Sequence, residues 1–337
     1  MHRNTPRENT MQPNVSSQSS LQILARAMAR SAKACIASSI VVVSLLTHAN
    51  AREVILPYKD LKLNANLELA TGKKPADGVI LITHGGLGHH GMEVITYLQK
   101  LLRDRGYNTL AINLSLGLNH RHGMYDCAVI HRHANDDAVA EIGAWVGWLK
   151  KQGATRVVLL GHSRGGAQTA LYATEAKSPL VKAVVLLAPA TRDNTDTATY
   201  LRNFNKPLGP LLEKAQSLHN TGKGSTVLEH IGLMNCADTS ATVDTFISYY
   251  AQDPDNLRLD TPSLLPKIKF PVLVLVAGND EVVIGLEKKI EPMADGKRVQ
   301  MKIIEGADHL LRDLSADESA DAIDSFLKDV GYASRNR

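Results

Sequence analysis

Short aliphatic runs alternate with helical patterns along most of the chain. Runs rich in Val, Ile and Leu predict buried strands at residues 78–83, 109–114, 156–160, 183–187, 272–276 and 301–304. Between them, apolar residues at helical spacing predict helices near residues 92–105, 135–151, 164–175 and 316–330. This alternation is typical of an α/β protein with a mostly parallel sheet and helices on both faces. Partial alternation of apolar and polar residues at 53–58 and 63–70 predicts a leading antiparallel hairpin.

One interval breaks this rhythm. From about residue 191 to about residue 270 no run predicts a strand until the one that begins at 272. Three segments have helical patterns instead: Leu211–Leu218, Thr226–Leu233 and Thr242–Tyr250. We interpret the interval as a helical cap inserted into a domain that spans residues 52–337. Such a cap is expected over the carboxyl edge of the sheet, where ligands bind in folds of this kind.

The first 51 residues have the pattern of a cleavable signal peptide. Residues 34–46 are apolar and uncharged, and three basic residues precede them, Arg26, Arg30 and Lys33. The run is short for a membrane span, and Ala49-Asn50-Ala51 has the small-x-small form of a cleavage site. The sequence therefore predicts cleavage after Ala51 and export to the periplasm or the medium, with no membrane attachment afterwards. An uncleaved membrane anchor and a buried helix are the alternatives. Translation could begin at Met28 instead of Met1, which would give a shorter leader.

The charges outside this leader are balanced. The chain has 38 basic and 34 acidic residues. Five of the basic residues and one of the acidic residues lie in the first 51 positions, which leaves 33 of each in the rest of the chain. A nucleic-acid binder carries a basic face, so this balance argues against nucleic acid as a partner. The cleaved chain would keep two cysteines, Cys127 and Cys236. An oxidising compartment would permit a disulfide between them, and two free thiols are the alternative.

A glycine-rich turn follows one of the predicted strands. The run Val157–Leu160 leads into Gly161-His162-Ser163-Arg164-Gly165-Gly166, and a helical pattern comes next. This is G-x-S-x-G between a strand and a helix, the context in which the motif exposes a nucleophilic serine. We predict Ser163 as the nucleophile. The alternative is a serine that caps a helix.

A second glycine-rich loop, His84-Gly85-Gly86-Leu87-Gly88, follows the strand at 79–83. Acyl transfer places negative charge on an oxygen that backbone N–H groups stabilise. We predict that Arg164 supplies one such N–H and Gly86 the other, with Leu87 as second choice. The run 86–91 also fits the dinucleotide pattern G-x-G-x-x-G. However, the next strand ends in Asn113-Leu114-Ser115 and lacks the acidic residue that this alternative needs.

Two more strand ends carry the acid and the base that a serine nucleophile needs. Asp280 follows the strand at 272–276, with Glu281 as second choice, and His309 follows the strand at 301–304. The order Ser163, Asp280, His309 is the one expected for this sheet topology. Taken singly, the two residues would be interpreted as a helix cap and a surface histidine.

These motifs carry a family resemblance. HGG at 84–86, GHSRGG at 161–166, GND at 278–280 and GADH at 306–309 make the chain similar to the α/β-hydrolase superfamily over about residues 53–330. GHSRGG also resembles segments of dienelactone-hydrolase-like and chlorophyllase-like enzymes. The resemblance implies an eight-stranded, mostly parallel sheet and hydrolysis through an acyl-enzyme.

The loop at residues 115–133 is rich in histidine, with His-x-His pairs at 120–122 and 131–133. We interpret it as a polar loop that lines the pocket, where His120 and His122 contact the substrate together with His84. A zinc site and a solvated loop are the alternatives. Arginines at 121, 132 and 164 would favour a substrate that carries a carboxylate.

The sequence thus predicts an exported serine hydrolase that cleaves small carboxylic esters and needs neither a metal nor an organic cofactor. Cleavage of amides or thioesters and acyl transfer would use the same residues. A non-catalytic binding protein on this fold is the alternative from another class.

Overall fold

The computed structural model describes residues 51–251 and 259–332. The predicted leader falls on residues 1–50 and therefore lies outside the described residues. Within the two described ranges, no helix combines the length and the apolar character needed to cross a membrane.

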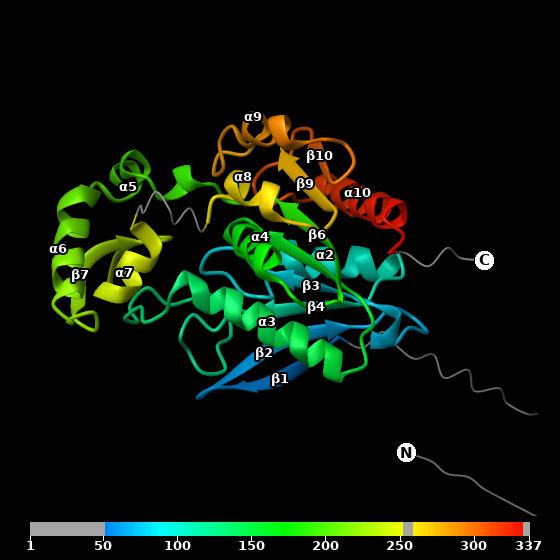
Figure 1. Cartoon of the computed structure of the whole chain (residues 1–337), viewed down its shortest axis with the longest axis horizontal. Coiled ribbons are helices and arrows are strands. Elements are labelled where there is room, and N and C mark those ends of the chain that lie inside the picture. Colours follow the sequence, from blue (N-terminus) through cyan, green and yellow to red (C-terminus); the bar gives the residue numbers. More distant parts are fainter. Residues whose placement is uncertain (1–50, 252–258, 333–337) are drawn as a thin grey trace, which may run out of the picture. The chain divides into compact units, whose positions relative to one another are not determined.

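The described residues form one large sheet (Figure 1). Its strands are β1 (Arg52–Tyr58), β2 (Leu61–Glu68), β3 (Val79–Thr83), β4 (Thr109–Asn113), β5 (Val157–His162), β6 (Val181–Leu187), β9 (Val272–Ala277) and β10 (Val299–Ile304). They lie in the order β1-β2-β4-β3-β5-β6-β9-β10. The pairs β1–β2 and β2–β4 are antiparallel and the other pairs are parallel. This confirms the leading hairpin and the mostly parallel sheet of eight strands among the described residues.

Helices cover both faces of the sheet because the central strands are apolar on both sides. The main ones are α2 (Glu93–Asp104), α3 (Asn135–Lys151), α4 (Arg164–Glu175) and α10 (Leu314–Asp329). Leu81 and Leu159 pack with residues of α3 and α4 on one face. Their neighbours Ile82 and Leu160 pack with α2 and α10 on the other face. Shorter helical segments are η1 (Pro75–Asp77), η3 (Leu265–Lys267), α9 (Leu286–Ile290) and η4 (Glu291–Met293).

The insertion between β6 and β9 is a cap of mixed structure. It contains η2 (Arg192–Thr195), α5 (Thr197–Phe204), α6 (Leu208–Asn220), β7 (Val227–Leu233), β8 (Cys236–Thr242), α7 (Val243–Tyr250) and α8 (Thr261–Leu264). Strands β7 and β8 pair antiparallel, so the prediction of an all-helical cap is wrong. In particular, the segment Thr226–Leu233, predicted to be helical, is mostly strand.

A bulge explains the error in β7. The pairing register shifts between Leu228 and Ile231, and His230 has a φ of +55°. The extra residue interrupts the two-residue alternation of a strand. Leu228 and Ile231 are consequently both buried although they lie three positions apart, which is the spacing of a helix.

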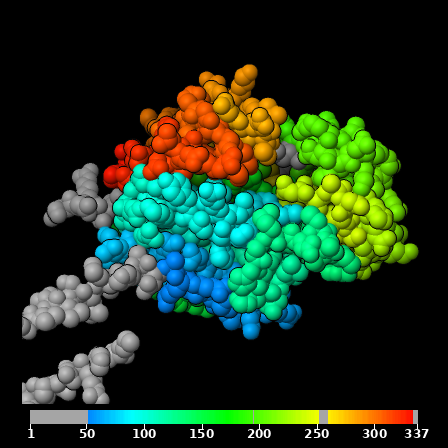
Figure 2. Space-filling model, turned by 180° about the vertical axis from the view of Figure 1, so that it is seen from behind, coloured from blue at the N-terminus to red at the C-terminus, as the bar shows by residue number. Residues whose placement is uncertain are grey.

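The cap has its own apolar core and is attached to the body by a disulfide and by several hydrogen bonds. Tyr200, Phe246 and Tyr250 pack inside it. Cys127 and Cys236 form a disulfide, with their Cα atoms 5.6 Å apart, so the two residues are not free thiols. Nearby, His131 pairs with Ala241 by backbone hydrogen bonds. Figure 2 shows the cap, coloured green to yellow, beside the part of the body that contains the loop at residues 115–133.

Candidate active site

Ser163 lies at the tip of the turn between β5 and α4, in a backbone conformation that is unusual for a non-glycine residue. Its φ is +55° and its ψ is −126°, outside the regions that a side chain normally allows. The flanking glycines make this turn sterically feasible. A methyl group on Gly161 would overlap the carbonyl oxygen of Gly165, and one on Gly165 would overlap that of His84. The strained turn therefore holds the hydroxyl beyond the end of β5.

The structure brings Ser163, His309 and Asp280 into a hydrogen-bonded chain. The Nε2 atom of His309 lies 2.8 Å from the Oγ atom of Ser163. Its Nδ1 atom lies 2.8 Å from the Oδ2 atom of Asp280. If Nδ1 carries the proton and donates it to the carboxylate, Nε2 is free to accept the serine proton. The arrangement can thus make the serine oxygen nucleophilic.

Asp280 is fixed as a carboxylate beneath His309. Its Oδ1 atom accepts hydrogen bonds from the backbone N–H groups of Val282 and Val283, at 2.7 and 2.8 Å. Burial alone would raise the pKa of Asp280, but the hydrogen bonds from His309 and these N–H groups lower it below its usual value. The exposed Glu281, the second choice, is not the partner of His309.

His162 supports the site in a way that sequence reasoning missed. It is buried, and its Nε2–H donates to the carbonyl oxygen of His309 at 2.8 Å. Burial lowers its pKa to about 4, so the ring is neutral at pH 7. The one available signal was its position next to Ser163, at the end of a buried strand.

The glycine-rich loop after β3 lies directly against Ser163. A Cβ atom on Gly85 would come within 2.8 Å of the Cβ atom of Ser163, so only glycine permits this approach. Gly86 follows with a φ of +45°. Gly86, Leu87 and Arg164 line the same cavity as Ser163 and His309. Helix α4 begins at Arg164, and the first N–H groups of a helix lack carbonyl partners and attract negative charge.

The cavity in front of Ser163 has a volume of about 310 Å³. Its walls come from the glycine-rich loop, from Met124, from Val282 and Val283, and from three cap residues, Asn203, Met234 and Asn235. Arg164 also lines this cavity, and the central carbon of its guanidinium lies 5.3 Å from the centre of the Tyr249 ring. The cap therefore lies over the carboxyl ends of the strands, as predicted.

The histidines predicted to contact substrate do not line this cavity. His84 is fully buried, where its Nε2 atom accepts a hydrogen bond from the Leu114 N–H, and burial lowers its pKa to about 3. His120 and His122 are exposed beside β1, where both approach Glu53. Of the loop at residues 115–133, Met124 lines the cavity. The prediction that this loop presents histidines to the substrate is therefore not met.

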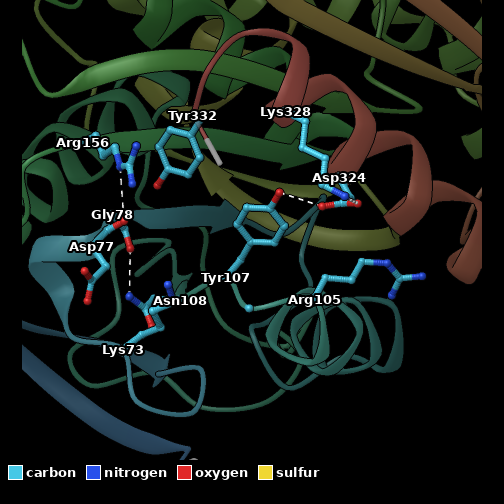
Figure 3. A pocket seen from close by; sticks show the side chains of 11 residues that line it. Lys73, Asp77, Gly78, Arg105, Tyr107, Asn108, Arg156, Asp324, Lys328 and Tyr332 are labelled. Atoms are coloured by element: carbon cyan, nitrogen blue, oxygen red, sulfur yellow. Dashed lines mark hydrogen bonds and ion pairs between the residues drawn. The ribbon is translucent and has the colours of Figure 1, made fainter. Parts of the chain in front are cut away.

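A second cavity, of about 340 Å³, lies at the opposite ends of the strands (Figure 3). Tyr107, Arg156 and Tyr332 are among its lining residues, and the Tyr107 hydroxyl donates to Asp324 across it. It contains none of the predicted site residues. The cavity at Ser163 is accordingly the candidate active site.

Comparison with known proteins agrees with this geometry. The model of the "Alpha/beta hydrolase family" matches residues 79–322, which is more than half of the chain. The chain belongs to this family. The mostly parallel sheet with helices on both faces is accordingly an α/β-hydrolase fold.

Related proteins and structures carry esterase or hydrolase names. A Mycoplasma pneumoniae protein named "Putative esterase/lipase 3" is 36% identical over 123 residues, which cover 36% of this chain and 40% of that protein. The match thus spans less than half of the relative's length. Among solved structures, Est1E from Butyrivibrio proteoclasticus has a TM-score of 0.60 at 17% identity, covering 84% of this chain and 100% of its own. The Pyrococcus furiosus esterase Pf2001 has a TM-score of 0.56 at 16% identity, covering 83% and 91%. These structural likenesses concern the fold.

In this α/β hydrolase the turn between β7 and β8 is a site element that the sequence concealed. A Cβ atom on Gly86 would lie 3.1 Å from the Oδ1 atom of Asn235. The neighbouring Met234 N–H donates to the Tyr250 hydroxyl at 3.1 Å, which holds the turn over the cavity. Because the bulge in β7 hid the hairpin, no local pattern pointed to this turn.

Proposed function

We propose that this α/β hydrolase cleaves carboxylic esters, with Ser163 as the nucleophile. The observation that carries the proposal is the chain of two 2.8 Å contacts that joins Ser163 to His309 and His309 to Asp280. Family membership and the name of the partial relative support the same reaction class.

The proposed reaction has two halves. The Ser163 oxygen attacks the ester carbonyl carbon while His309 takes the serine proton. The tetrahedral intermediate collapses, and His309 returns the proton to the departing alcohol. Water then attacks the acyl-enzyme, His309 again takes and returns a proton, and the carboxylic acid leaves. Asp280 orients His309 and stabilises its charged form throughout.

The developing oxyanion is proposed to accept hydrogen bonds from the backbone N–H groups of Arg164 and Gly86, with Leu87 as the second candidate on the loop. Each such donor typically contributes about 2.7–4 kcal/mol to transition-state stabilisation. The start of α4 at Arg164 and the position of Gly86 on the cavity wall support this assignment.

The test combines labelling with a substrate series. The full chain should react with a fluorophosphonate probe at Ser163, and the Ser163→Ala variant should not. A cavity of about 310 Å³ is at the small end of ligand pockets. We therefore expect p-nitrophenyl acetate to hexanoate to be cleaved faster than the palmitate.

Matched amides and thioesters distinguish the alternatives. Faster turnover of the p-nitroanilide or thioester of the same acyl group would overturn the ester assignment and retain the nucleophile. A folded protein that neither reacts with the probe nor cleaves any of these substrates would instead be a binding protein.

We also propose that the chain is exported and cleaved after Ala51. The apolar run at 34–46 and the basic residues before it support this, as does the Cys127–Cys236 disulfide, since disulfides persist in oxidising compartments. N-terminal sequencing of the protein from periplasm and medium should begin at Arg52. Recovery of the uncleaved chain from the cytosol alone would contradict export.

A further inference from the structure

We propose that Glu53, His120 and His122 form a binding site for one divalent transition-metal ion, of which Zn²⁺ is the test case. Glu53 is in β1 and the two histidines lie beside this strand, and none of the three residues lines the cavity at Ser163. The proposal concerns a structural site and is independent of the proposed esterase reaction.

The three side chains place their ligand atoms together. The carboxylate of Glu53 and one ring nitrogen of each histidine all lie within 4.8 Å of one another. The Oε1 atom of Glu53 is 2.6 Å from the Nε2 atom of His122 and 3.6 Å from that of His120. Around tetrahedral zinc, ligand atoms at about 2.0–2.2 Å from the metal are about 3.3 Å apart. A shift of under about 1 Å in exposed side chains would therefore suffice.

The hydrogen bonding of His122 orients its Nε2 atom toward Glu53, at 2.6 Å, and toward the Nδ2 atom of Asn64, at 3.4 Å. Its Nδ1 atom lies 2.9 Å from the backbone carbonyl oxygen of His120. A carbonyl oxygen can only accept, so Nδ1 carries the proton and, in the neutral ring, Nε2 presents its lone pair to Glu53. Metal-binding histidines typically donate their other ring N–H in this way. The 2.6 Å contact between Nε2 and the Oε1 atom of Glu53 is a hydrogen-bond distance, so a bound ion would replace the shared proton and separate these two atoms to about 3.3 Å.

The backbone holds both histidines in place before any ion binds. Between them, the Arg121 side chain is buried and anchored to several carbonyl oxygens. The His120 N–H donates to the Lys62 carbonyl at 2.9 Å, and His120 has a φ of +51°. The rings of His120 and His122 consequently meet edge to face, with their centres 4.5 Å apart. Such preorganisation reduces the entropic cost of binding.

The donor set selects the type of ion. Two imidazoles and one carboxylate suit zinc, copper and nickel, whereas magnesium and calcium prefer all-oxygen sites. Water would complete the coordination. An ion here would connect β1 to the loop at residues 115–133, so binding should raise the thermal stability of the chain.

The experiment uses the full chain with a histidine-free affinity tag, stripped of metal with a chelator. Calorimetric titration with ZnCl₂ should show one saturable site, and the same titration with MgCl₂ should show none. The melting temperature should rise with Zn²⁺. We expect His122→Gln and Glu53→Gln to weaken Zn²⁺ binding by roughly tenfold or more, since each removes one of three ligands.

His219→Gln is the matched control. His219 is also exposed and lies 2.8 Å from a carboxylate oxygen of Asp244, but no second histidine accompanies it in the described residues. This variant should bind Zn²⁺ as the wild type does. All variants are at exposed positions, and circular dichroism of the metal-free proteins verifies the fold.

Three outcomes would overturn the proposal. The first is the absence of saturable Zn²⁺ binding with a dissociation constant below about 1 mM, a value that already corresponds to weak binding. The second is unchanged affinity in both His122→Gln and Glu53→Gln. The third is a loss of binding in His219→Gln, which would place the site elsewhere.

Discussion

Ser163→Ala is expected to lower kcat for p-nitrophenyl acetate by about 10⁴- to 10⁶-fold, the range found when a catalytic triad loses its nucleophile. The physical reason is that the proposed acyl-enzyme route disappears, because among the described residues that line the cavity only Ser163 has a hydroxyl, which lies 2.8 Å from the Nε2 atom of His309. Measuring kcat and KM separately should show that the loss is mainly in kcat. The folded state should be unaffected.

Asp280→Asn tests the second contact of the same chain. An amide in place of the carboxylate would present a donor or a neutral acceptor to His309 and would favour the wrong tautomer, which typically lowers kcat by about 10⁴-fold. A Ser163→Ala, Asp280→Asn double variant should be little worse than Ser163→Ala, since the residues act as a unit.

Ser217→Ala, at an exposed position in α6, is the matched control and should retain full activity. Retention of more than roughly a tenth of the wild-type kcat by Ser163→Ala would show that another residue is the nucleophile, because triad loss is far larger.

Arg121→Met is expected to have the largest effect on stability. The guanidinium is buried and donates to the carbonyl oxygens of Leu114, Gly88 and Gly123, and to the Oδ1 atom of Asn113. Burial lowers the pKa of Arg121 to about 10, so it is charged at neutral pH. Methionine fills similar space but leaves these carbonyls without a donor. We expect a loss of about 3 kcal/mol or more in the free energy of unfolding.

The same substitution should also reduce activity. Gly88 ends the loop that carries Gly86 to the cavity, so its release should displace the proposed oxyanion donor and lower kcat by roughly 10²-fold. Urea unfolding measures the first effect, and kcat well below the melting temperature measures the second. Arg132→Met, at an exposed position in the same loop, should change stability by less than about 0.5 kcal/mol. A similarly small effect of Arg121→Met would contradict this account of the buried guanidinium.

The strands and the three residues Ser163, Asp280 and His309 could be predicted because their signals are local. Each predicted parallel strand is a short, mostly aliphatic run, and each of the three residues lies three to five positions after such a run. In a parallel sheet the carboxyl ends of the strands share one edge. Adjacency to a strand end was therefore enough to predict that these residues would come together.

The cap and the histidines could not be predicted in the same way. A single bulge at His230 gave β7 the burial spacing of a helix. Because β7 was therefore not predicted as a strand, the turn after it, which contributes Asn235 to the cavity, was not predicted either. The segment His120-Arg121-His122 contains only polar side chains, which gave no indication that the arginine turns inward and the histidines outward.

The sequence by itself determined the α/β architecture, the turn that carries Ser163 and the order of the candidate catalytic residues, because aliphatic periodicity and glycine requirements act over a few neighbouring positions. Only the tertiary structure decided which side of each loop faces the cavity, which carboxylate meets His309 and how the cap covers Ser163. Those outcomes depend on contacts between segments far apart in the chain, such as Glu53 with His122 or Cys127 with Cys236. No local pattern of residues encodes such a contact.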